Sequence, residues 1–218
     1  MKIRLPERKN IKETGKADPL KFYYTPISRS FYLARFSDAI RLLGGHIDRL
    51  LEVGCGSGIF LPELSKHCEN LFACDVHDKL CLTKEMLVAE SVNVDLIKAD
   101  ACSLPYPSES MDGIVCMSVL EHIYDLNSPA EEFYHILRPG GVAIIGLPVS
   151  SIVTQMILKM SYLTLDARLE DEHVSTYKDV LRAFNEKFVY EGGLHIPRLL
   201  PEQIRLYTTI RFRKPNNS

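Results

Sequence analysis

The stretch that decides the fold is Leu50-Leu51-Glu52-Val53-Gly54-Cys55-Gly56-Ser57-Gly58-Ile59-Phe60. An apolar run enters three closely spaced glycines and then a helical pattern, so the stretch predicts a strand, a tight turn and a helix, in that order. Glycines in such a turn let a ligand lie against bare backbone and face the N–H groups of the helix N-terminus. A dinucleotide-binding fingerprint would need a glycine at position 59, where Ile59 stands, and this counts against an NAD site.

Outward from this turn, short apolar runs alternate with helical patterns, which is typical of βαβ units and a parallel sheet. Five parallel strands are expected over residues 49–53, 70–75, 94–98, 113–117 and 142–147. Two closing strands, 188–196 and 204–214, are joined by too few residues for a helical crossover, so they should be antiparallel to each other. Helices are expected over residues 59–68 and 78–91, over 129–137 with Ser128 as N-cap, and over 176–188 with Ser175 as N-cap.

The composition bounds the class of protein. The chain has 218 residues, of which 46% are hydrophobic and 25% charged, with a formal net charge of −2. These values exclude disordered, collagen-like and membrane-embedded chains, and they fit one α/β domain with an appendage. Residues 1–45 have a helical pattern of their own, so we expect a cap at 1–45 and a main domain at 46–218. The expected core-facing set of the cap is Phe31, Leu33, Ala34, Phe36, Ile40, Leu42 and Leu43.

Cysteine usage and the chain ends bear on the cellular compartment. Six cysteines without a C-x-x-C pair, and an N-terminus without an apolar signal region, predict free thiols and a cytoplasmic location. Cys55 and Cys102 have no paired Cys or His nearby, so no metal site is predicted. The longest apolar stretch, 152–165, is shorter than the roughly 20 residues that cross a bilayer, so no membrane span is expected.

The small net charge hides an uneven distribution. Residues 1–41 carry ten Lys and Arg against four Asp and Glu, residues 42–194 carry eleven against twenty-three, and residues 195–218 carry five against one. Basic ends can bind phosphate-bearing partners, although charges spread over solvated helix faces would give the same counts.

Two carboxylates stand where strands are predicted to end. Asp75 follows the second strand, and a carboxylate at this place can accept from both hydroxyls of a ribose. Asp100 follows the third strand and can accept from an exocyclic amine such as that of adenine. Open α/β sheets bind ligands at this edge, so these residues and the glycine turn predict one nucleotide-like site.

Four blocks of the sequence, in this order, resemble the class I S-adenosylmethionine-dependent methyltransferases, in particular the small-molecule branch (methyltransferase type 11) that includes ubiquinone and menaquinone biosynthesis enzymes. The blocks are Leu51–Gly58, Ala73-Cys74-Asp75-Val76, residues 99–106 running into 111–123, and Leu137-Arg138-Pro139-Gly140-Gly141. The resemblance implies a three-layer Rossmann-like sandwich with a mostly parallel seven-stranded sheet and an antiparallel last strand. It also implies S-adenosyl-L-methionine as cofactor and S-adenosyl-L-homocysteine as product.

The resemblance assigns roles to residues at the strand ends. Glu52 and the turn with Gly54, Cys55, Gly56 and Gly58 would hold the methionine portion of the cofactor. Asp75 would bind the ribose, with Val76 beside the adenine, and Asp100 and Ala101 would bind the adenine edge. Met117 and Ser118 would border the methionine amino group and the sulfonium, and His122 would face the transferred methyl group.

The acceptor is less well specified than the cofactor. A small, partly apolar acceptor is expected, with residues 149–174 as the substrate lid that this family builds after the fifth strand. His122 and His173 are the candidate catalytic bases, and Tyr24 is both a further base candidate and the preferred contact from the cap to the cofactor.

The alternatives to a small-molecule methyltransferase are an RNA or protein methyltransferase and a non-catalytic S-adenosylmethionine-binding protein. Ser118-Val119-Leu120-Glu121 stands where a nucleic-acid base methyltransferase would carry an N-P-P-Y-type tetrapeptide, which counts against nucleic acid. The chain is expected to be a monomer or a homodimer.

Overall fold

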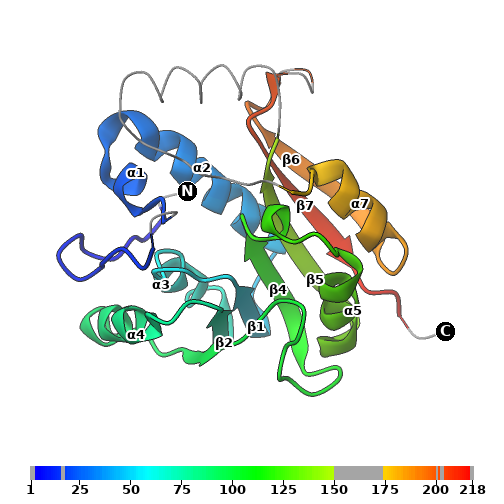
Figure 1. Cartoon of the computed structure of the whole chain (residues 1–218), viewed down its shortest axis with the longest axis horizontal. Helices are drawn as coiled ribbons and strands as arrows, with labels where there is room; N and C mark the ends of the chain where they lie inside the picture. Colours follow the sequence, from blue (N-terminus) through cyan, green and yellow to red (C-terminus); the bar gives the residue numbers. More distant parts are fainter. Residues whose placement is uncertain (1–2, 16–17, 150–173, 200, 202–203, 217–218) are drawn as a thin grey trace.

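A single seven-stranded sheet organises the computed structural model, which describes residues 3–15, 18–149, 174–199, 201 and 204–216 (Figure 1). The strands are β1 (Ile47–Val53), β2 (Cys68–Asp75), β3 (Asp95–Lys98), β4 (Met111–Met117), β5 (Leu137–Pro148), β6 (Val189–Ile196) and β7 (Tyr207–Arg213). Their order across the sheet is β3-β2-β1-β4-β5-β7-β6. Strands β1 to β5 pair in parallel, whereas β7 runs antiparallel to both β5 and β6. The predicted mostly parallel sheet with an antiparallel last strand is confirmed.

Helices cover both faces of this sheet. They are α1 (Leu20–Tyr24), α2 (Pro26–Leu43), α3 (Leu61–Leu64), α4 (Leu80–Ala89), η1 (Leu120–His122), α5 (Asn127–Ile136) and α7 (Tyr177–Asn185). Neighbouring strand residues point to opposite faces, and Leu50 accordingly packs with α1 to α4 while Leu51 packs with α5 and α7. Two apolar clusters therefore lie on the two sides of the sheet, as a three-layer sandwich requires (Figure 1).

Three predicted helix boundaries were wrong. The helix expected over 59–68 is only α3, because the chain must enter β2 already at Cys68. Helix α5 begins at Asn127 with Leu126 at the N-cap; Asp125 receives the Asn127 N–H (3.1 Å) and the Ser128 hydroxyl (2.7 Å), so Ser128 is not the cap.

The N-cap of α7 also lies one residue beyond the predicted one. Thr176 caps this helix in a capping box with Asp179, whereas the Ser175 hydroxyl donates to the Ile123 carbonyl oxygen (2.6 Å). A serine and a threonine stand side by side here, and the acidic residue three positions after Thr176 selects the threonine.

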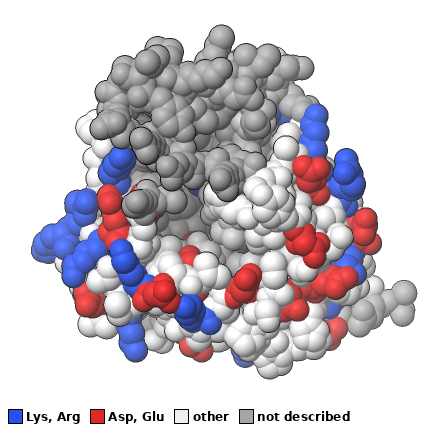
Figure 2. Space-filling model, viewed as in Figure 1, with Lys and Arg blue, Asp and Glu red and all other residues white. Residues whose placement is uncertain are grey.

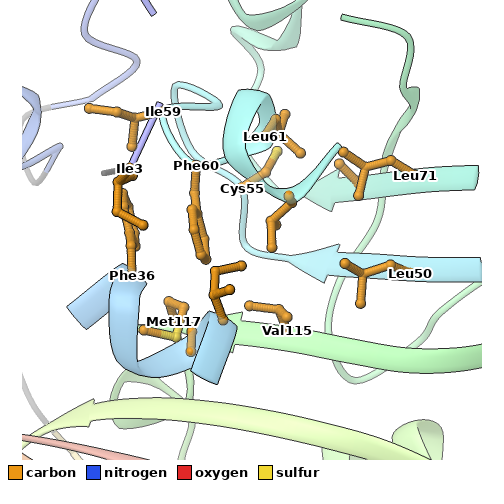
Figure 3. Close-up of a cluster of buried hydrophobic side chains, with 14 of the residues drawn as sticks. Ile3, Phe36, Leu50, Cys55, Ile59, Phe60, Leu61, Leu71, Val115 and Met117 are labelled. Carbon is orange, nitrogen blue, oxygen red and sulfur yellow. The ribbon is translucent and has the colours of Figure 1, made fainter. Parts of the chain in front are cut away.

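The N-terminal helices are part of the core. Phe36 of α2 stacks on Phe60 with ring centroids 3.9 Å apart, and Met117 of β4 lies beside them (Figure 3). Phe36, Ile40 and Leu43 of the expected core-facing set are buried. Helix α2 thus shares one apolar cluster with the sheet. The division into a cap at 1–45 and a domain at 46–218 stays a prediction.

The basic ends of the chain are paired with its acidic middle. Lys12 pairs with Glu85 (3.0 Å), and Arg211 and Arg213 both pair with Glu191 (2.6 and 2.5 Å). Figure 2 shows blue and red side chains next to each other along both edges of this face. At these positions, basic residues from the two ends of the chain therefore form ion pairs with acidic residues from its middle.

The expected substrate lid, 149–174, lies outside the described residues except for its two ends. The Val149 N–H donates to the Leu206 carbonyl oxygen (3.0 Å), and the Val174 N–H donates to that of Glu121 (2.9 Å). Among the helices of the described part of the chain, none has the length and hydropathy to cross a bilayer.

Candidate functional site

A cavity of about 540 Å³ lies at the carboxyl ends of β1, β2 and β4. The N-terminal segment supplies one wall through Thr14, Asp18 and Pro19, and α2 supplies Arg35 and Phe36. Because the strands are parallel, their carboxyl ends meet at one edge, which is where α/β sheets bind ligands. The sheet edge that the sequence predicted as the ligand site therefore has a cavity.

The glycine turn forms the floor of this cavity. The N–H groups of Gly54 and Cys55 both donate to the Cys74 carbonyl oxygen (2.9 and 3.1 Å), which anchors the turn to β2. Gly54 has φ +77°, and a Cβ there would approach Val119 Cγ2 to 2.1 Å. Gly58 has a different task, because a Cβ on it would meet Met86 and Thr83 of α4 at 2.7 Å. Gly58 is thus a packing glycine and does not line the cavity.

The two predicted strand-end carboxylates both line the cavity. Asp75 accepts the Gly56 N–H on Oδ2 (2.7 Å) and the His77 N–H on Oδ1 (3.2 Å). Asp100 accepts the Cys102 N–H on Oδ1 (2.9 Å). Each carboxylate oxygen has more than one lone pair, so both groups retain capacity for ligand hydroxyls or amines.

Glu52 is a buried carboxylate at the end of β1 that also lines the cavity. Its Oε2 atom has no hydrogen-bond partner. Burial, with a further contribution from the charge of Asp75, raises the pKa of Glu52 well above its ordinary value near 4.5. A buried acceptor of this kind suits a cationic or hydroxyl-bearing ligand that brings its own donor.

A buried cation stands in the same cavity. The Arg35 guanidinium donates to Ser118 Oγ (2.5 Å) and to the Tyr207 hydroxyl (3.2 Å), and it lies over the Tyr207 ring at 4.2 Å. Its Nε atom has no hydrogen-bond partner. Ser118 has φ +59°, an uncommon conformation for a serine and one that is met at functional sites. Arg35 and Glu52 therefore offer a buried guanidinium and a buried carboxyl group to a single ligand.

The structure brings most of the predicted site residues together. Those that line the cavity are Glu52, Gly54, Cys55, Gly56, Asp75, Val76, Asp100, Ala101, Met117, Ser118 and His122. Tyr24 does not line it: its hydroxyl donates to the Pro6 carbonyl oxygen (2.7 Å), and the neighbouring Tyr23 lies on the cavity instead. His173 lies outside the described residues. No group of three His, Cys, Asp or Glu side chains in the described ranges is arranged to hold a metal ion.

Sequence reasoning missed Asp18, Tyr23, Arg35 and His77 among the lining residues. His77 stands two residues after Asp75, so its place next to the strand end was a usable signal. Arg35 had no local signal, because an arginine in a helix is ordinarily exposed and only the packing of α2 on the sheet buries it.

Comparison with known proteins agrees with this geometry. The methyltransferase domain family matches residues 51–145. The ubiquinone biosynthesis O-methyltransferase of Xylella fastidiosa is 28% identical over 151 residues, which are 68% of this chain and 61% of that protein. The protein of the same name from Cupriavidus pinatubonensis is 31% identical over 107 residues, 48% of this chain and 42% of that protein. The chain thus spans less than two thirds of the length of these relatives.

Solved structures share the fold. The N-methyltransferase NodS from Bradyrhizobium japonicum WM9 superposes with a TM-score of 0.66 at 20% identity, covering 86% of this chain and 98% of that one. The [4+2]-cyclase SpnF superposes with a TM-score of 0.64 at 16% identity, covering 87% and 82%. At these identities the likeness concerns the fold alone. The family match therefore concerns residues 51–145, which are similar to a methyltransferase domain and carry the strand-end carboxylates of the cavity.

Proposed function

We propose that this protein transfers a methyl group from S-adenosyl-L-methionine to a small, partly apolar acceptor. The observation that carries the proposal is that two buried groups, Arg35 and Glu52, line one cavity with the glycine turn and Asp75. Bound there, the cofactor supplies a methyl group already activated on a sulfonium centre.

The residues present fit such a cofactor. The unpartnered Glu52 Oε2 suits its ammonium group, and the Arg35 guanidinium, with its unpartnered Nε, suits its carboxylate. Asp75 has acceptor capacity left for the ribose hydroxyls, while Asp100, Ala101 and Val76 also line the cavity and are proposed to contact the adenine. Val76 is 58% exposed, and such an apolar side chain gains from being covered by a flat ring.

The acceptor side is proposed from the relatives and from the cavity wall. The named relatives are O-methyltransferases of ubiquinone biosynthesis, so an acceptor hydroxyl is the first atom to test. Such a hydroxyl must lose its proton as the methyl group is received, and His122, on the cavity lining, is the base proposed to take it. Residues 149–174 are proposed as the substrate lid, and the cytoplasm as the location.

Calorimetry with S-adenosylmethionine, S-adenosylhomocysteine and NAD tests the cofactor. We expect both sulfur ligands to bind and NAD not to bind; absence of binding at millimolar concentration of the sulfur ligands would refute the proposal. Asp75→Ala should weaken binding by about 1–3 kcal/mol, the scale of a lost charged hydrogen-bond partner. Asp95→Asn is the control, because Asp95 is exposed at the start of β3 and does not line the cavity.

Radiolabelled methyl transfer into fractionated metabolite, lipid and RNA pools tests the acceptor. We expect label in the metabolite or lipid fraction, and label confined to RNA would favour the nucleic-acid alternative. Binding of the cofactor without transfer to any pool would instead favour a non-catalytic role. His122→Asn should lower kcat and leave the affinity for S-adenosylhomocysteine unchanged.

A further inference from the structure

We propose that His77 is a positioning residue that holds the Gly56 peptide in the conformation needed to bind the cofactor. The inference rests on the proposed function, since it concerns the same cavity. His77 follows β2 by two residues and lies on the cavity lining together with Gly56 and Asp75. It is not one of the residues that the family resemblance assigned to the site.

Both backbone polar groups of Gly56 are hydrogen-bonded to residues outside the turn. Its N–H donates to Asp75 Oδ2 (2.7 Å), while its carbonyl oxygen faces His77 Nε2 (3.0 Å) and accepts from Thr83 Oγ1 (3.0 Å). Asp75 in turn accepts the His77 N–H on Oδ1 (3.2 Å). Asp75, Gly56 and His77 are therefore joined pairwise by hydrogen bonds, which form a closed ring next to the glycine turn.

The contacts of the imidazole determine its tautomer. A carbonyl oxygen can only accept, so Nε2 must carry the proton that is donated to Gly56. The Lys79 N–H can only donate, and it points at His77 Nδ1 from 3.1 Å, so Nδ1 must be the acceptor. The neutral Nε2–H tautomer satisfies both contacts, and the ring is thereby oriented without any group of the ligand.

This orientation matters because no described residue packs against the Gly56 Cα. Gly56 has φ +52°, and a Cβ placed on it would meet no atom within 4 Å. Its conformation must come from hydrogen bonds at its peptide groups, since packing does not impose it. Asp75, the proposed ribose ligand, is held by the same ring, so loosening His77 would disturb two cofactor contacts at once.

The variant His77→Leu removes both ring nitrogens at similar size, and His77→Gln is the matched control because its amide nitrogen can still reach the Gly56 carbonyl oxygen. Calorimetry with S-adenosylhomocysteine should show binding weakened about threefold to tenfold in His77→Leu, the scale of one net hydrogen bond, and mostly restored in His77→Gln. In turnover assays, KM for S-adenosylmethionine should rise in His77→Leu while kcat stays close to that of the wild type.

Hydrogen–deuterium exchange of the ligand-free protein gives a second readout. Amides of residues 54–58 should exchange faster in His77→Leu than in the wild type, and His77→Gln should resemble the wild type. A folded His77→Leu protein with unchanged affinity and unchanged exchange would overturn the inference and leave the proposed function intact. A wild-type protein that binds no S-adenosylhomocysteine would overturn both. Equal losses in His77→Leu and His77→Gln would also overturn it, because they would point to ring packing and not to the Gly56 contact.

Discussion

Replacing Glu52 by glutamine should make the ligand-free protein more stable and the cofactor complex weaker. Glu52 is 4% exposed, its Oε2 has no partner, and the charge of Asp75 adds to the cost of ionising it. The pKa of Glu52 is therefore raised in the folded protein, so ionisation of this carboxyl opposes folding. A neutral glutamine of nearly the same shape avoids that cost.

The sign and size follow from linkage. Below the unfolded-state pKa near 4.5, both states hold the proton and wild type and Glu52→Gln should differ little. As the pH rises above that value, the unfolded wild type loses its proton first, and the wild type loses about 1.4 kcal/mol of unfolding free energy per pH unit until the folded pKa is reached. We expect Glu52→Gln to be more stable than the wild type by about 1–3 kcal/mol at pH 7.5, because an unpartnered buried charge costs more than an unpartnered buried amide, and by less at pH 5.

Urea denaturation of the ligand-free proteins at pH 5 and pH 7.5 measures this difference. Calorimetry at pH 7.5 should show S-adenosylmethionine bound about 1.5–3 kcal/mol more weakly by Glu52→Gln, the range for a hydrogen bond to a charged group. Equal stability of the two proteins at pH 7.5, or a gain of the same size at both pH values, would refute the reasoning.

Asp112→Asn is the control for the stability measurement. Asp112 is also buried, but it accepts the Arg49 N–H (2.8 Å) and pairs with the Arg138 guanidinium. Because its charge is partnered in the ligand-free protein, Asp112→Asn should lower the unfolding free energy. A stabilised Asp112→Asn would show that removing any buried charge in this fold stabilises it, whatever its partners.

Three further predictions follow from the site and its surroundings. Arg35→Met should weaken binding of S-adenosylmethionine at least tenfold in calorimetry but leave binding of its decarboxylated form nearly unchanged, and equal losses for both ligands would contradict a carboxylate contact. Gly54→Ala should lower the unfolding free energy measured by urea denaturation by about 2–4 kcal/mol, since φ is positive and the new methyl group would overlap Val119. Adding Val119→Ala to this variant should recover part of the loss. Iodoacetamide should alkylate Cys81 first, because it is the exposed thiol, whereas burial raises the pKa of Cys74 to about 12; peptide mass spectrometry that found Cys74 labelled first in the folded protein would contradict this.

The sequence by itself determined the sheet and its ligand edge. Apolar runs covered on both faces have a clear pattern, so β1 and β4 were predicted close to their observed bounds. Parallel strands bring their carboxyl ends to one edge by geometry alone, and Glu52, Asp75 and Asp100 therefore lie on one cavity as expected. The sequence was less decisive about the N-cap of α7, where Ser175 and Thr176 adjoin. The cap is the residue whose hydroxyl accepts from the first turn of the helix, and this is Thr176.

Tertiary structure alone decided which residues of α1 and α2 reach the site. Neighbouring residues on a helix point about 100° apart, so the approach of α1 to the sheet placed Tyr23 on the cavity and turned Tyr24 towards Pro6. Arg35 reads as an ordinary surface arginine until α2 packs across β5, β6 and β7, where Ser118 and Tyr207 receive its guanidinium. A sequence pattern relates each residue only to its neighbours along the chain and says nothing about which distant segment packs on it. The charge that the proposed cofactor carboxylate needs comes from a segment more than eighty residues away from Ser118, and only the packed fold brings the two together.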